Sequence, residues 1–137
     1  MIEYLIAVIF MIILSAIDFM TFFKKNEGIP AVISTLFLIT VFILVWNTYG
    51  LMAGVLAGLI AMMLVDLNLF QGVPDVKCFI ACGITLESFI MVSLFGAFTI
   101  GVGIAYQFLV RKMGFKQIPF LPAILIAYIG VVGVMLL

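Results

Sequence analysis

The sequence predicts an all-α protein, a polytopic membrane bundle of about six transmembrane helices in which the fourth helix is short. Two observations lead to this fold class: 68% of the 137 residues are hydrophobic and only 9% are charged, against roughly 25% charged residues in an average soluble domain. Six basic and six acidic side chains are too few to cover a soluble body of this size, so we expect the bilayer to be the main solvent. At about 20 residues per crossing, the helices and short turns use residues 1–137 as a single domain.

The composition excludes several classes of function. The chain contains no histidine and only two cysteines, Cys78 and Cys82, so catalytic pairs that need histidine and zinc sites built from histidine or thiolates alone are excluded. The two thiols lie one helical turn apart in an apolar run and are interpreted as small buried hydrophobes. The net charge is zero and no basic face or tail is present, which argues against nucleic-acid binding. We expect no metal and no cofactor.

Breaks in the apolar sequence separate the predicted helices, which cover residues 2–23, 29–46, 51–70, 76–86, 88–110 and 119–137. The first helix contains Glu3 where a signal peptide has basic residues, and it lacks a small-residue cleavage pattern, so it is expected to be a retained span. Along the third, Gly50, Gly54 and Gly58 recur at every fourth position. This spacing lets a neighbouring helix backbone approach closely.

The fourth predicted helix is too short to cross a bilayer by itself. Its eleven residues, 76–86, make about 16 Å of helix against a hydrocarbon core of about 30 Å. It must therefore be a half-span sheltered by its neighbours, or it must extend past Glu87.

The distribution of basic residues decides between six crossings and five. Basic side chains gather in the cytoplasmic loops of membrane proteins. With six crossings every basic residue falls on one side, whereas a single long helix over residues 76–110 splits them three against three. The six-helix interpretation places both termini, Glu3 and Glu87 on the outer side. The basic residues are Lys24, Lys25, Lys77, Arg111, Lys112 and Lys116.

Three aspartates, Asp18, Asp66 and Asp75, are residues that a helical bundle does not require. A carboxylate at the centre of a spanning helix costs about 2.5 to 3.5 kcal/mol and usually marks a functional interior. Asp18 lies six residues before Lys24 and Asp66 lies five before Gln71, while Asp75 opens the fourth helix. Three helices therefore bring carboxylates to one depth near the cytoplasmic face.

Two carboxylates at one site favour the chemistry of aspartyl proteases. They share a proton, so one deprotonates a water molecule while the other protonates the substrate carbonyl. This chemistry requires neither metal nor histidine. The alternative is that each aspartate is an interfacial carboxylate beside Lys24 or Lys77. The common depth of all three favours the catalytic interpretation.

Residues 72–83, GVPDVKCFIACG, resemble the motif of the type IV prepilin peptidase family, Gly-x-Gly-Asp-x-Lys followed by a small-residue helix that ends in glycine. Two further features agree in order along the chain. Asp18 stands at the cytoplasmic end of the first helix, where short members of that family carry their other catalytic aspartate. Residues 118–122, IPFLP, resemble the start of the family's last helix. The resemblance extends along nearly the whole chain.

The resemblance implies that Asp18 and Asp75 are the catalytic pair of an aspartic endopeptidase in a prokaryotic cytoplasmic membrane. Gly72, Pro74 and Lys77 would belong to the active-site turn. Asp66 matches no catalytic position and is interpreted as a carboxylate that supports the pair or lies at the membrane interface. Lys77 is expected either to hold the charge of the pair or to face lipid phosphates, and the phosphate role is favoured because it is the commoner one.

The resemblance also implies the partners. The substrate would be a prepilin-like protein of a type IV pilus, an archaeal flagellum or a protein secretion system, with a basic leader, a small residue before the cut and a hydrophobic N-terminal helix. Membrane lipid would be the other partner. Long members of the family methylate the new N-terminus with a cytoplasmic insertion that carries paired Cys-x-x-Cys motifs. This chain has no such insertion, so we expect peptidase activity alone.

Two departures from the family pattern leave other hypotheses open. Pro74 stands where the motif has its second glycine, and residues 29–31, IPA, follow Asp18 later than the family's Ile-Pro-Asn and without the asparagine. The second hypothesis is therefore a catalytically silent scaffold of a pilus or secretion machine. The third is a proton or cation transporter that uses Asp18, Asp66 and Asp75 as a relay. Against it, no ionisable residue lies at mid-depth or in the outer half of any predicted helix apart from the two edge glutamates.

Overall fold

The computed structural model describes residues 2–22, 28–67, 73–114 and 121–137, and over these residues it has six helices and no strand. The all-α prediction is confirmed, and the helix ends agree with the predicted ranges to within about four residues. The helices are α1 (Ile2–Phe22), α2 (Gly28–Leu44), α3 (Thr48–Asp66), α4 (Val73–Leu86), α5 (Phe89–Lys112) and α6 (Leu121–Leu136).

Two of these helices, α3 and α5, are long and apolar enough to cross a membrane, with 19 and 24 residues. The apolar stretches described in α1, α2 and α6 are shorter, covering Ile2–Ile17, Ala31–Leu44 and Leu121–Leu136. The chain therefore has membrane-span character in α3 and α5 by length and composition.

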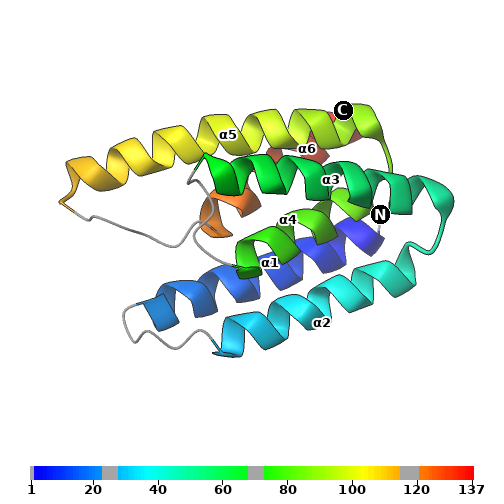
Figure 1. Cartoon of the computed structure of the whole chain (residues 1–137), viewed down its shortest axis with the longest axis horizontal. Coiled ribbons are helices and arrows are strands. Elements are labelled where there is room, and N and C mark those ends of the chain that lie inside the picture. Colours follow the sequence, from blue (N-terminus) through cyan, green and yellow to red (C-terminus); the bar gives the residue numbers. More distant parts are fainter. Residues whose placement is uncertain (1, 23–27, 68–72, 115–120) are drawn as a thin grey trace.

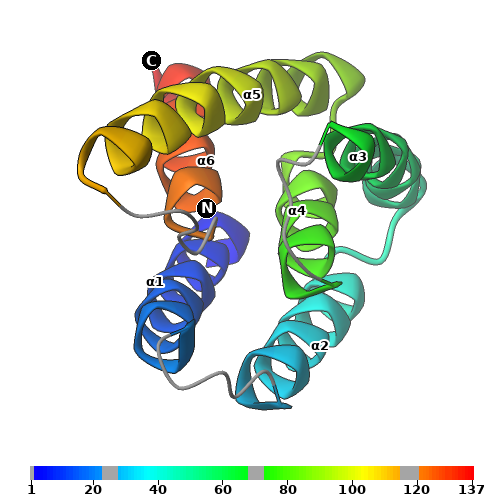
Figure 2. The same cartoon turned by 60° about the vertical axis from the view of Figure 1, so that its left-hand side comes forward.

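The short helix α4 is the centre of the bundle. It packs against each of the other helices, most extensively against α3 and α2, and Figure 2 shows it inside the arc that the others form. Its 14 residues make a helix about 21 Å long. The helix ends at Leu86 because Glu87 adopts a left-handed backbone conformation, with φ of 53°, a conformation that commonly ends helices. Of the two sequence-based alternatives, the structure has a short helix that is sheltered by its neighbours and does not extend past Glu87.

The helices alternate in direction, which gives the bundle two chemically different ends (Figure 1). At one end α1 begins and α6 ends, together with the α2–α3 and α4–α5 connections. Glu3 and Glu87 lie at this end. The described basic residues Lys77, Arg111 and Lys112 belong to the opposite end, where α4 begins and α5 ends. The described basic residues therefore lie at one end, called the basic end below, together with Asp66 and Asp75 and opposite Glu3 and Glu87. The distribution of basic residues predicted this placement for the described basic residues.

Helices α3 and α4 approach each other closely because small residues line their contact. A Cβ atom added to Gly54 would lie 2.7 Å from Cγ1 of Ile84, and one added to Gly58 would lie 3.9 Å from Cδ1 of Ile80. The glycine spacing of this helix predicted close packing, and Gly54 and Gly58 both face α4.

The faces of α3 differ in side-chain size. The large residues Leu59, Met62 and Met63 are 56 to 65% exposed. The buried residues of α3 are mostly glycine and alanine, namely Gly50, Ala53, Gly54, Ala57, Ala61 and Leu64. The helix thus packs its small residues inward and turns its bulky apolar residues outward.

Hydrogen bonds link the α2–α3 and α4–α5 connections, at the end of the bundle that holds Glu3 and Glu87. The Asn47 side chain accepts a hydrogen bond from the Gly50 amide at 2.7 Å and so caps α3. Its Nδ2 also donates to Oε1 of Glu87 at 3.4 Å. One side chain therefore links the start of α3 to the residue that ends α4.

Candidate active site

Asp75 is the buried carboxylate of the described structure. It lies in the first turn of α4 and is only 6% exposed. A negative side chain there interacts favourably with the partial positive charge of the helix N-terminus, an effect worth about 0.3 to 1 kcal/mol. Because α4 is the central helix, this carboxylate reaches the interior of the bundle near its basic end.

Asp18 lies in α1, four residues before the helix ends at Phe22. Helices α1 and α4 pack against each other, and the end of α1 lies at the same end of the bundle as the start of α4 (Figure 1). The backbone therefore brings the two predicted catalytic positions to one end and onto neighbouring helices. The side chain of Asp18 lies outside the described residues.

Ser15 lies one helical turn before Asp18 and is also buried, at 8% exposure. Its Oγ is the buried side-chain oxygen that has no hydrogen-bond partner among the described residues. The other buried hydroxyls of the described residues have recorded partners, as when Ser34 donates to the Ala31 carbonyl at 3.0 Å and Thr99 to the Phe95 carbonyl at 2.8 Å. The sequence analysis missed Ser15, although its spacing of three residues from Asp18 places both on one helix face.

The remaining predicted residues are placed differently. Asp66 is exposed at the last residue of α3, a position that favours the interfacial alternative for this carboxylate. Pro74 lies in the first turn of α4, where the missing N–H of proline removes no intrahelical hydrogen bond. Gly72 lies outside the described residues.

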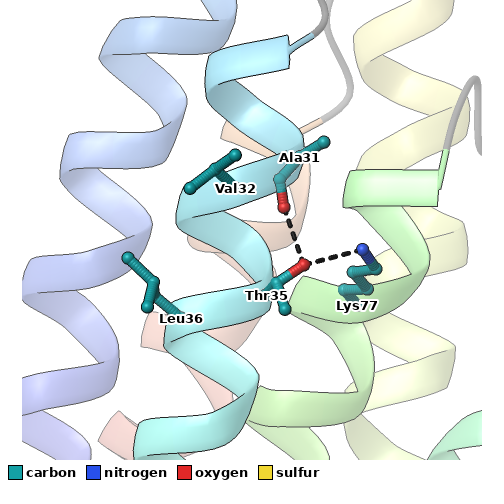
Figure 3. Close-up of a pocket in the computed structure, with 5 residues that line it drawn as sticks. All are labelled: Ala31, Val32, Thr35, Leu36 and Lys77. Carbon is teal, nitrogen blue, oxygen red and sulfur yellow. Dashed lines mark hydrogen bonds between the residues drawn. The ribbon is translucent and has the colours of Figure 1, made fainter.

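Lys77 lies in the second turn of α4 and turns toward α2 (Figure 3). Its Nζ donates a hydrogen bond to Oγ1 of Thr35 at 2.8 Å, and the Thr35 hydroxyl donates in turn to the Ala31 carbonyl at 2.8 Å. Residues two apart on a helix point in directions about 200° apart. Lys77 and Asp75 therefore leave α4 on nearly opposite faces, which favours the lipid-facing role for this lysine.

The described residues form no metal site, and the comparisons with known proteins found no match. Within the part of the chain that the structure describes, no three metal-binding side chains of His, Cys, Asp or Glu come together. Comparisons with protein-family models, with curated proteins and with solved structures give no match for this chain. The arguments for function therefore rest on the residues and their placement.

Proposed function

We propose that this protein is a membrane-embedded aspartic endopeptidase that removes the short basic leader of a prepilin-like protein at the cytoplasmic face. The observation that carries the proposal is the placement of Asp75. A buried carboxylate stands in the first turn of the central helix, at the end of the bundle where the neighbouring α1 carries Asp18.

The surface supports the membrane part of the proposal. Soluble monomers rarely expose contiguous apolar patches larger than a few hundred Å². Here large apolar side chains are exposed on every helix other than α4, and α3 buries its small residues instead. Helices that pack within a bilayer show this arrangement because lipid solvates the large residues. The protein would cross the membrane several times.

The position of the described basic residues supports the proposed orientation of the protein in the membrane. Lys77, Arg111 and Lys112 lie at the end that also holds Asp75, and basic residues favour the cytoplasmic side. Both termini and the two glutamates would then be outside. The substrate would reach the site from within the inner leaflet, with its hydrophobic helix against the bundle.

The proposed reaction uses the two carboxyl groups and one water molecule. The ionised aspartate takes a proton from water as the hydroxide oxygen bonds to the scissile carbonyl carbon, and the protonated aspartate gives its proton to the carbonyl oxygen. The tetrahedral intermediate then collapses, the C–N bond breaks, and the amine leaves with a proton returned from the pair. No metal is required.

Co-expression with candidate prepilins, followed by gel-shift detection of the shortened product, tests the proposal. Asp18→Asn and Asp75→Asn should each lower cleavage by at least about a hundredfold, because each removes a proton-transfer group. Asp66→Asn is the matched control, since this carboxylate is exposed at the end of α3, and it should cleave normally. Full cleavage by either of the first two variants would contradict the proposal.

The scaffold hypothesis has its own test at Pro74. The helix start accepts proline at this position, so the residue does not by itself prevent the fold. If the parent protein cuts no prepilin and Pro74→Gly does, the parent is a silent scaffold and the endopeptidase proposal fails. Cation transport by the purified protein in liposomes, lost in Asp66→Asn, would instead favour the relay hypothesis.

A further inference from the structure

A groove open to the surroundings runs between α2 and α4 near the basic end of the bundle. Its volume is about 300 Å³, and it is lined by Ala31, Val32, Thr35, Leu36 and Lys77. Val32 and Leu36 are 60% and 53% exposed. The groove is therefore mostly apolar and open to the outer surface, with the Lys77 ammonium group at its edge (Figure 3).

The ammonium group of Lys77 is held in position by a hydrogen bond to α2. The Lys77 ammonium group has three N–H donors, and the hydrogen bond recorded for it uses one of them, on the Thr35 hydroxyl. That hydroxyl is neutral and is itself oriented by the Ala31 carbonyl. The hydroxyl therefore positions the ammonium group without cancelling its positive charge.

The surrounding field also favours an anion. Lys77 lies in the second turn of α4, close to the positive end of the dipole of that helix. The buried carboxylate of Asp75 leaves α4 on nearly the opposite face. The groove therefore combines positive potential at one end with an apolar wall alongside it.

We infer that this groove binds an acidic phospholipid of the inner leaflet, with the phosphate on Lys77 and an acyl chain along Val32 and Leu36. Charge complementarity selects the anionic headgroup, because the cytoplasmic leaflet carries anionic lipids that basic residues attract. The apolar wall selects a lipid over a free phosphate ion. A basic leader peptide does not fit beside the lysine because both are positively charged. The inference rests on the membrane location proposed above and is independent of peptidase activity.

The test is lipid binding by the purified full-length chain in detergent, measured by native mass spectrometry. The probes are phosphatidylglycerol and phosphatidylcholine with identical acyl chains. We expect the protein to prefer phosphatidylglycerol about five- to tenfold. Lys77→Met should remove this preference. Lys112→Met is the matched control, since Lys112 lies at the same end but sits 5.6 Å over the Phe108 ring, and it should keep the preference.

A second variant keeps the test decisive if Lys77→Met does not fold. Thr35→Val retains the shape of the side chain and the lysine charge but removes the hydroxyl that positions the ammonium group, and it should lower the preference at least twofold. An unchanged preference in Lys77→Met, or in Thr35→Val where Lys77→Met does not fold, would overturn the inference. An equal loss in Lys112→Met would also overturn it, because binding would then be non-specific.

Two further measurements separate the alternatives. Glycerol phosphate at millimolar concentration should not displace the lipid, and displacement would identify a free-phosphate site instead. Asp75→Asn should bind phosphatidylglycerol like the parent protein. A chain that prefers this lipid but cuts no prepilin would uphold the lipid site and reject the peptidase.

Discussion

Gly83 of α4 lies directly against the side chain of Ala57 of α3, so closely that a Cβ atom at position 83 would overlap the Ala57 methyl group. Both residues are buried. The contact joins the central helix to its most extensive neighbour. The absence of a side chain at position 83 is therefore one condition for the short distance between the two helices.

Gly83→Ala should destabilise the protein by about 1 to 3 kcal/mol, because the added methyl group forces the helices apart. Thermal unfolding in detergent, followed by size-exclusion chromatography, measures the loss. Gly101→Ala is the matched control, since a Cβ atom there meets nothing within 4 Å in α5. It should leave the unfolding temperature unchanged or slightly higher. Equal losses in both variants would contradict the packing argument.

Thr85 and Tyr128 form a buried hydrogen bond of 2.6 Å between α4 and α6. Thr85 also donates to the Cys82 carbonyl at 2.6 Å, so the tyrosine hydroxyl is the donor in the shared bond. Tyr128→Phe should cost about 1 kcal/mol of stability, whereas Thr85→Val should cost about 1 to 3 kcal/mol because it leaves a buried hydroxyl without its acceptor.

The double variant Thr85→Val with Tyr128→Phe tests the coupling of this pair. Its loss of stability should be smaller than the sum of the two single losses, because the polar partners are removed together. Strictly additive losses would show that the two hydroxyls do not interact.

The variant Ser15→Ala tests whether the buried hydroxyl one turn before Asp18 affects stability, cleavage or both. A buried hydroxyl without a partner costs about 1 to 3 kcal/mol, so its removal should raise the free energy of unfolding. If the hydroxyl assists the proposed reaction, cleavage falls at the same time, as happens when a site is kept at the expense of stability. A loss of stability would contradict the placement of this side chain.

Trp46, the single tryptophan of the chain, reports on membrane location. It follows the end of α2 and is 67% exposed, and Tyr49 in the first turn of α3 is 74% exposed. Such aromatic residues gather at membrane interfaces. In vesicles its fluorescence should be quenched more strongly by a nitroxide near the lipid headgroup than by one deep in the acyl chain. The absence of quenching by either probe would contradict the proposed membrane location.

The helices could be predicted from sequence because long apolar runs indicate their extent and the charged or polar breaks between the runs indicate their ends. The spacing of Gly54 and Gly58 also predicted the close approach of a neighbouring helix, although it did not say that this helix would be α4. The position of α4 at the centre did not, since periodicity gives the face of a helix but not its neighbours.

The site was predictable only in part, for the same reason. The sequence allowed Lys77 either to hold the charge of the aspartate pair or to face lipid phosphates. The direction of its side chain became clear only from its hydrogen bond to the Thr35 hydroxyl on α2. Thr35 carried no signal beyond being a polar residue in an apolar segment, and the signal for Ser15 was its spacing of three residues from Asp18. The peptidase family itself stays a prediction, because it rests on short motifs.

The central position of α4 has a consequence for how the protein is made. A segment of 14 residues cannot be anchored by lipid alone, because it is shorter than the roughly 20 residues that a spanning helix needs. Its final neighbours include α5 and α6, which leave the ribosome after it. If the protein is inserted into a membrane as proposed, the burial of α4 is complete only after α5 and α6 have been synthesised.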